Sequence, residues 1–370
     1  MEPQTKTLAP PRDPQLDGDD ATNRSLAVRA GLTAFGLLAV LFMSYFLLQV
    51  QSTVTLLIVG ILLATAIAGP VEYLHRYLRL RRGLAILLMY LTILLALVLA
   101  VTLLVPLVTR EGRTFARDFP QQIEALRAQL AASENALLRT AGNQLFDLLD
   151  GQRLAGALAA LPVLLLGALS GLGGGLVSVF TVFLITFYWL SEKPAIKRAV
   201  VSAFPTRQRQ RALRLWGQIE DKLGDWLRGQ LLLMLVIGMA ATITYGLMGL
   251  PFWLILGLIA GLTEALPNIG PILGAIPAVL VALTVGWQWA LGVIAFVTVL
   301  QFVENAVLVP RIMKGAVGLS PLVVILAILA GGEFRGVVGA LLAVPIAAAA
   351  SVIVGDLARE RRQQETQETA

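Results

Sequence analysis

Long runs of apolar residues constrain the fold of this chain more than any other feature. Residues 83–108, 161–190 and 231–250 are almost wholly apolar, and a helix of about 20 such residues crosses the hydrocarbon core of a bilayer. Strands of a membrane barrel alternate apolar and polar residues, so these runs exclude a barrel. Charged residues make up 14% of the chain, against about a quarter in soluble domains. The sequence predicts an all-α polytopic membrane protein.

Residue types that many enzymes and metal sites require are nearly absent. The chain has no cysteine and a single histidine, His75, among arginines in a short loop. The chain therefore lacks the residues needed for thiol catalysis, for metal clusters held by thiolates or histidines, and for a Ser-His-Asp triad. No Gly-x-x-x-x-Gly-Lys-Ser/Thr phosphate loop is found,. We expect no enzyme activity, cofactor or metal, and any transport would draw on an ion gradient or a partner.

Basic residues beside the apolar runs set the expected orientation. Arg76, Arg79, Arg81 and Arg82 lie in one short loop, which the positive-inside rule places in the cytoplasm. We predict a disordered cytoplasmic tail (1–23), three membrane spans (24–109), an extracytoplasmic amphipathic helical insert (110–160), a fourth span (161–190), cytoplasmic basic amphipathic helices (191–229), a C-terminal membrane bundle with broken helices (230–355) and a cytoplasmic tail (356–370). About eight membrane segments result. Lipid contact explains the net charge of +6 better than nucleic acid does.

Two polar segments between the spans have helical periodicity. In the insert, Ile123, Leu126 and Leu130 recur at helical spacing,. This favours a helical hairpin packed on the membrane domain or on a neighbouring subunit, with a ligand-capturing domain as the alternative. In residues 191–229, Trp216 and Trp226 belong to one apolar stripe beside several arginines. That pattern predicts a helix lying at the membrane interface, with tryptophan at headgroup level.

The apolar run 251–285 is interrupted in a way that a lipid-facing helix does not allow. It contains Glu264, Asn268 and three prolines within about ten residues, and one proline inside a helix costs roughly 3 kcal/mol. Irregular backbone at membrane depth is tolerated only where protein or a water-filled cavity surrounds it. A second long run, 319–354, is interrupted near Glu333. Paired broken segments are typical of the substrate site of secondary transporters.

Three acids in these regions are the best candidates for binding a cation or a proton: Glu264, Glu304 and Glu333. A charge deep in a bilayer costs at least about 2.5–3.5 kcal/mol and usually faces a partner or water. Glu304 could instead pair with Arg311, and Glu333 with the adjacent Arg335. Glu264 has no basic residue near it in sequence, so the functional interpretation is strongest there.

The predicted site combines these acids with the polar, proline and glycine residues around them. Gln301 lies three and four residues from Glu304 and Asn305, so the three share a helix face. The predicted transport pathway comprises Glu264, Pro267, Asn268, Gly270, Pro271, Gly274, Gln301, Glu304, Asn305, Arg311 and Glu333. The predicted gate or hinge residues are Pro277, Pro310, Gly331, Gly332, Gly336, Gly339 and Pro345.

The same regions resemble the autoinducer-2 exporter family, also called the PerM-type permease family. The resemblance is carried by ALPNIGPILGAIPAVLVAL, by the stretch from QFVENAVLVPRIMKG to GGEFRGVVGALLAVPIAA, and by the insert after the third span. The family's Pro-Asn-x-Gly-Pro element falls on residues 267–271, its Pro-Arg element on Pro310 and Arg311, and its Gly-Gly-Glu element on residues 331–333. The likeness extends from about residue 26 to residue 355.

This resemblance implies a homo-oligomer of the bacterial inner membrane. The positive-inside rule predicts that both termini lie in the cytoplasm, and the basic residues beside the spans favour membrane lipids as partners. It implies a secondary transporter that exports a small polar molecule, such as autoinducer-2, a furanone-type signal. Sodium or lithium/proton antiport is the alternative within the family. A membrane scaffold or regulatory protein without transport activity is a further alternative, and nucleic acid is not expected as a partner.

Overall fold

The computed structural model describes residues 51–132, 140, 172–313 and 319–368. The expected N-terminal tail, the first span and residues 141–171 lie outside this part. Every regular element in the described ranges is a helix, which confirms the all-α prediction. Six described helices are long and apolar enough to cross a membrane, namely Gln51–Tyr77, Arg82–Leu104, Val177–Ser202, Thr206–Leu247, Trp287–Ile312 and Pro321–Glu360. The chain is therefore a multi-pass membrane protein.

Helix α2 (Arg82–Ala131) joins the third span to the first part of the expected insert without a break. Its apolar face beyond the span, with Phe115, Phe119 and Ile123, is buried in a cluster that also contains residues of α7, α8 and α9. Phe115 stacks on Phe119 at 4.6 Å between ring centroids and meets Phe252 edge to face. The described part of the insert is thus a helical extension packed on the C-terminal bundle.

Helix α5 (Leu172–Ser202) is followed by α6 (Thr206–Leu247), which is charged in its first half and apolar in its second. No charged residue follows Arg228 within α6. The charged half and the apolar half thus form one continuous helix. Trp226 is buried in a cluster with residues of α11, so its ring packs on protein.

Helix α7 (Trp253–Thr263) runs back along α6 and turns into α8 (Gly270–Val285) through residues 264–269. With 11 residues, α7 is about 16 Å long and cannot cross a hydrocarbon core of about 30 Å. Its contact with α6 is very close: a Cβ atom at Gly261 would lie 2.8 Å from the carbonyl oxygen of Met234. Helices α7 and α8 therefore form a helical hairpin whose first arm is too short to span the hydrocarbon core,.

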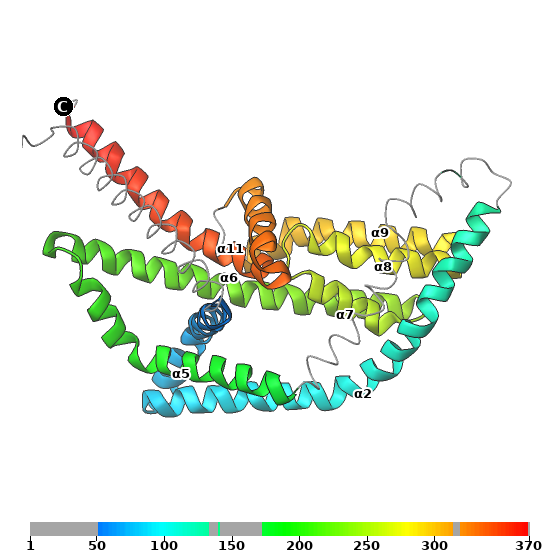
Figure 1. Ribbon diagram of the computed structural model, residues 1–370, viewed down its shortest axis with the longest axis horizontal. Helices are drawn as coiled ribbons and strands as arrows, with labels where there is room; N and C mark the ends of the chain where they lie inside the picture. Colours follow the sequence, from blue (N-terminus) through cyan, green and yellow to red (C-terminus); the bar gives the residue numbers. More distant parts are fainter. Residues whose placement is uncertain (1–50, 133–139, 141–171, 314–318, 369–370) are drawn as a thin grey trace, which may run out of the picture. The chain divides into compact units, whose positions relative to one another are not determined.

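The chain continues with α9 (Trp287–Val303), one π-helical turn η1 (Glu304–Leu308) and α10 (Val309–Ile312). In α11 (Pro321–Glu368), the backbone leaves the helical region at Arg335 and Gly336, and the chain folds back there (Figure 1). The two arms nearly touch, since a Cβ atom at Gly339 would lie 1.9 Å from the carbonyl oxygen of Gly331. The first arm, residues 321–334, is shorter than a full span. Both interrupted runs are therefore helical hairpins.

Candidate functional site

A cavity of about 360 Å³ lies among α6, the α7–α8 hairpin tip, the end of α9 and the arms of α11. Its polar lining comes from segments far apart in sequence, with Gln230, Glu264, Asn268, Glu304 and Asn305 facing it. Its remaining lining is Trp226, Leu233, Pro267, Val309, Pro310, Met313, Leu319, Pro321, Val324 and Val344. We call this space the polar cavity.

The hairpin tip places Glu264 in the polar cavity because four residues shortly after it end α7 and turn the chain back. Pro267 and Pro271 have no N–H group to donate. Asn268 adopts a left-handed conformation with φ of 67°, which asparagine tolerates better than most residues. A Cβ atom at Gly270 would lie 2.0 Å from the carbonyl oxygen of Thr263, so only glycine allows this tight return. Glu264, 2% exposed, is held at the end of α7.

Glu304 reaches the polar cavity from the other side, at the point where α9 changes into a π-helical turn. The N–H group of Val309 donates to the carbonyl oxygen of Glu304, five residues back. Proline at position 310 removes a donor from the next turn, and single π turns are frequent at functional sites. The Gln301 amide donates to the Glu304 carboxyl at 3.2 Å. Gln301, Glu304 and Asn305 thus share one face, as predicted from their spacing.

The two carboxyl groups interact with each other across the polar cavity. Two carboxylates at such close range repel unless a proton or a cation lies between them. Among the described residues, no third acid or histidine joins Glu264 and Glu304 in a potential metal site. A cation bound here would rely on these two carboxyl groups and on nearby amide oxygens.

Three buried polar atoms in the walls of the polar cavity lack a hydrogen-bond partner among the described residues. They are the indole Nε1 of Trp226, the amide Oε1 of Gln230 and the carboxyl Oε2 of Glu264. Gln230 donates its amide N–H to the backbone carbonyl of Glu264, at 2.5 Å. A buried polar group without a partner costs about 1–3 kcal/mol, so such groups point to a bound molecule or water. One donor and two acceptors are therefore available to a ligand.

The other predicted pathway residues are more dispersed. Pro271, Gln301 and Asn305 also line an open, largely apolar groove of about 660 Å³ between α8 and α9. Arg311 and Glu333 are exposed and do not line the polar cavity. No ion pair joins Arg311 to Glu304, and none joins Arg335 to Glu333, within the described part of the chain.

The predicted hinge residues have different structural roles. Pro310 lines the polar cavity, whereas Pro277 and Pro345 lie inside helices that continue past them. Gly336 is at the fold-back of α11, with φ of 56°. The approach of the two α11 arms involves Gly331 and Gly339, while a Cβ atom at Gly332 would meet no atom of the described residues within 4 Å. In the other hairpin, a Cβ atom at Gly274 would lie 2.8 Å from Ala260 Cα.

Trp226 and Gln230 were missed by the sequence analysis, although both face the polar cavity. They lie four residues apart on α6, where the apolar stripe beside arginines suggested a membrane-surface helix. The available signal was the position of Gln230, a lone amide at the start of a long apolar run. Because Gln230 follows the last charged turn of α6, the polar cavity lies toward the charged end of this membrane helix.

The comparisons with known proteins agree with this architecture. A family model described as AI-2E family transporter matches residues 35–359. This chain belongs to that family. YrrI of Bacillus subtilis is 36% identical over 63% of this chain and 69% of its own length. TqsA of Escherichia coli, named an AI-2 transport protein, is 28% identical over 78% of this chain and 81% of its own length. Escherichia coli PerM, named a permease, is 28% identical over 53% of this chain and 57% of its own length.

Proposed function

We propose that this AI-2E family transporter exports a small polar organic molecule through the polar cavity, without ATP hydrolysis. The observation that carries the proposal is the set of three buried polar atoms, on Trp226, Gln230 and Glu264, that have no hydrogen-bond partner among the described residues. A molecule with hydroxyl groups could donate to the two oxygens and accept from the indole N–H group. Each buried group left unpaired penalises a ligand that lacks the matching atom, so the site favours hydroxylated over purely apolar cargo.

The cargo class includes autoinducer-2, since TqsA is named for AI-2 transport. A cavity of about 360 Å³ has room for a molecule of that size together with water. We further propose that the protein resides in the bacterial inner membrane as a homo-oligomer with both termini in the cytoplasm. The charged half of α6 then faces the cytoplasm, and the polar cavity is loaded from that side.

Reconstituted vesicles test the export hypothesis. Purified full-length protein in liposomes is assayed for uptake of autoinducer-2 into those vesicles whose cytoplasmic face points outward, with imposed proton and sodium gradients. Glu264→Gln keeps the shape of the side chain but removes its charge, and we expect at least a tenfold loss of initial rate, the effect of losing about 1.4 kcal/mol. The matched control is Glu333→Gln, which makes the same chemical change at an exposed position and should leave the rate within twofold of wild type.

Equal losses in both variants would refute the polar cavity as the export site. Trp226→Phe refines the test because it removes only the indole N–H group and keeps an aromatic ring. We expect it to raise KM for autoinducer-2 more than it lowers kcat, since the lost hydrogen bond is made to bound cargo.

Cation/proton antiport is a second candidate, favoured by the presence of the Glu264 and Glu304 carboxyl groups in one cavity, where they interact electrostatically. A pair that holds either a proton or a cation would exchange one for the other. A pH-sensitive dye inside proteoliposomes should then report proton movement when sodium or lithium is added, and Glu304→Gln should abolish it. If no such movement occurs while autoinducer-2 transport proceeds whatever the sodium gradient, antiport is eliminated and export stands.

A further inference from the structure

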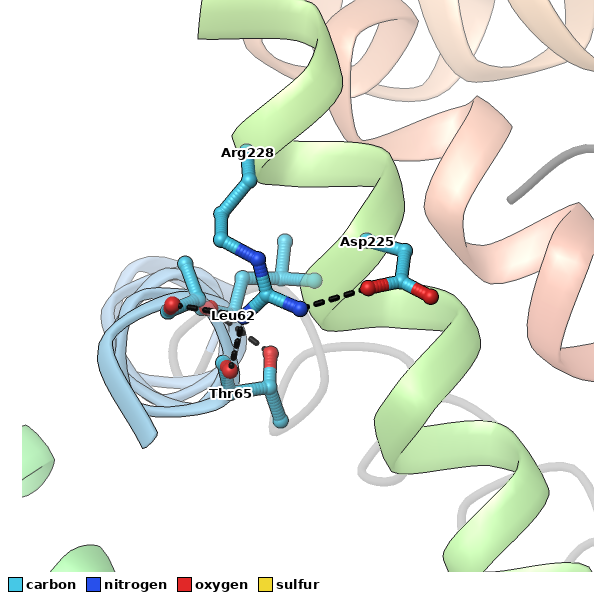
Figure 2. A network of polar contacts seen from close by, with 5 residues as sticks. Leu62, Thr65, Asp225 and Arg228 are labelled. Carbon is cyan, nitrogen blue, oxygen red and sulfur yellow. Dashed lines mark hydrogen bonds and ion pairs between the residues drawn. The ribbon is translucent and has the colours of Figure 1, made fainter. Parts of the chain in front are cut away.

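The guanidinium group of Arg228 lies where the helix Gln51–Tyr77 passes α6. Figure 2 shows the side chain reaching from α6 to the backbone of that helix. Its Nη1 atom donates to the carbonyl oxygen of Ala66 at 2.8 Å and approaches that of Thr65 at 3.4 Å. Its Nη2 atom donates to Asp225 at 2.5 Å. One arginine thus joins two helices through backbone acceptors.

The carbonyl group of Ala66 is available because of the residue four positions later. In an α-helix that carbonyl accepts the N–H group of residue 70, but residue 70 is proline and has no N–H group,. The segment is nevertheless helical at both positions. Ala66 is 4% exposed, so water has little access to its carbonyl oxygen, and a buried carbonyl needs a protein partner. Arg228 supplies the hydrogen bond that Pro70 cannot.

The two helices are close enough for this contact because a glycine lies at their crossing. A Cβ atom at Gly224, one turn before Arg228, would lie 2.7 Å from the carbonyl oxygen of Thr65. A larger residue there would push the helices apart and lengthen the hydrogen bond from Arg228. At this crossing the arginine side chain therefore contacts the backbone of the neighbouring helix directly.

The opposite face of the same α6 segment forms a wall of the polar cavity. Trp226 and Gln230 are each two residues from Arg228, which places them about 200° around the helix. They face the polar cavity while Arg228 faces the helix Gln51–Tyr77. Any rotation of α6 that breaks the arginine contact would also turn both cavity residues.

We propose that Arg228 is a positioning residue of the transport site: it binds the carbonyl freed by Pro70 and so fixes the rotation of α6 that presents Trp226 and Gln230 to the polar cavity. The inference rests on the proposed function for its meaning in transport. The contact of Arg228 with the Ala66 carbonyl and its effect on the rotation of α6 do not depend on which cargo, if any, is carried.

A double-substitution cycle tests the contact in the full-length protein. Arg228→Met removes the donors and keeps an apolar stem, while Pro70→Ala restores an N–H group that can bond to Ala66 within its own helix. Because the chain has no cysteine, Gln230→Cys serves as a reporter, and its rate of labelling by a small polar thiol reagent measures access to the polar cavity. This readout requires no transport.

We expect Arg228→Met to lower the labelling rate roughly tenfold, the effect of losing one hydrogen bond to a charged donor. In the Pro70→Ala background the same change should lower the rate less than threefold. Arg214→Met, at an exposed position of α6, is the matched control and should have no effect. In transport assays with autoinducer-2, Arg228→Met should raise KM with little change in kcat, whereas a purely structural role would reduce only the amount of folded protein.

An equal effect of Arg228→Met in both backgrounds would overturn the proposal, as would a fall in stability with labelling and KM unchanged. If Arg228→Met does not fold, Arg228→Lys, which retains one charged donor, is compared across the same two backgrounds. Absence of any autoinducer-2 transport in wild type would count against the proposed function alone, because the labelling cycle would still decide the role of Arg228.

Discussion

The substitution Gly257→Ala tests the close approach of α6 and α7. A Cβ atom at this position would lie 2.0 Å from the Thr242 hydroxyl oxygen and 2.6 Å from Thr242 Cα. The hydroxyl can rotate away, but the Cα atom belongs to the backbone of α6. To restore ordinary van der Waals separation, the two helices must move apart by roughly 0.8 Å, a gap that forfeits a quarter to a half of each local dispersion attraction.

The expected cost follows from two opposing effects. Overpacking at a close helix crossing destabilises by about 1–3 kcal/mol. Replacing glycine by alanine inside a helix contributes about 0.5–1 kcal/mol in the other direction. The two effects together allow a net loss of about 0–2.5 kcal/mol. Because the clash is with backbone, we expect Gly257→Ala to lower the free energy of unfolding by about 1–2 kcal/mol, a factor of roughly five to thirty in the ratio of folded to unfolded protein.

The assay is unfolding in mixed micelles, followed by tryptophan fluorescence. Gly217→Ala is the matched control, because it lies in α6 and a Cβ atom there would meet nothing within 4 Å in the part of the chain that the structure describes. This control should be neutral or slightly stabilising. Thr242→Ala should rescue Gly257→Ala only in part, since it removes the hydroxyl and leaves the clash with the backbone of α6.

Equal stability of Gly257→Ala and Gly217→Ala would refute the reasoning, because it would mean that the backbones of α6 and α7 are not held against each other. Complete rescue by Thr242→Ala would place the clash on the hydroxyl alone. Since α7 carries Glu264 at its end, the variant should also lose export activity beyond its loss of folded protein.

Three further predictions concern interactions outside the polar cavity. Burial raises the pKa of Glu111, whose carboxyl accepts an N–H group at the start of α7. The contribution of Glu111 to the free energy of unfolding is complete below its ordinary pKa of 4.5 and is lost as pH rises through the raised pKa. Glu111→Gln should therefore flatten the fall of the unfolding midpoint over that pH window. Gly339→Ala should separate the α11 arms and destabilise by about 1–3 kcal/mol, while Gly332→Ala should not, as unfolding titrations would show. Thr186→Val removes a buried hydroxyl whose one proton is shared between the carbonyl oxygens of Val182, at 2.7 Å in its own helix, and Gly60, at 3.0 Å in the neighbouring helix. It should cost about 0.5–1 kcal/mol in the same assay, and stability equal to wild type would contradict a hydrogen bond between the two helices.

Much of the architecture could be predicted from residue type alone, because the bilayer requires every backbone group to be satisfied within the protein. Apolar length indicated the spans, and prolines 267 and 271 without N–H groups indicated the break after α7. Spacing along one helix was sufficient to group Gln301, Glu304 and Asn305. These are local properties, and periodicity reports local properties reliably.

Contacts between distant segments were decided by the tertiary structure. Glu264 and Glu333 have similar sequence surroundings, yet the fold brings Glu264 to Glu304 and leaves Glu333 exposed. Trp226 joins the polar cavity because α11 packs over that face of α6. The role of Arg228 depends on a carbonyl group more than 150 residues earlier in the chain. A hydropathy pattern shows that a face is apolar or polar, but which neighbour covers that face is fixed only by close packing between helices.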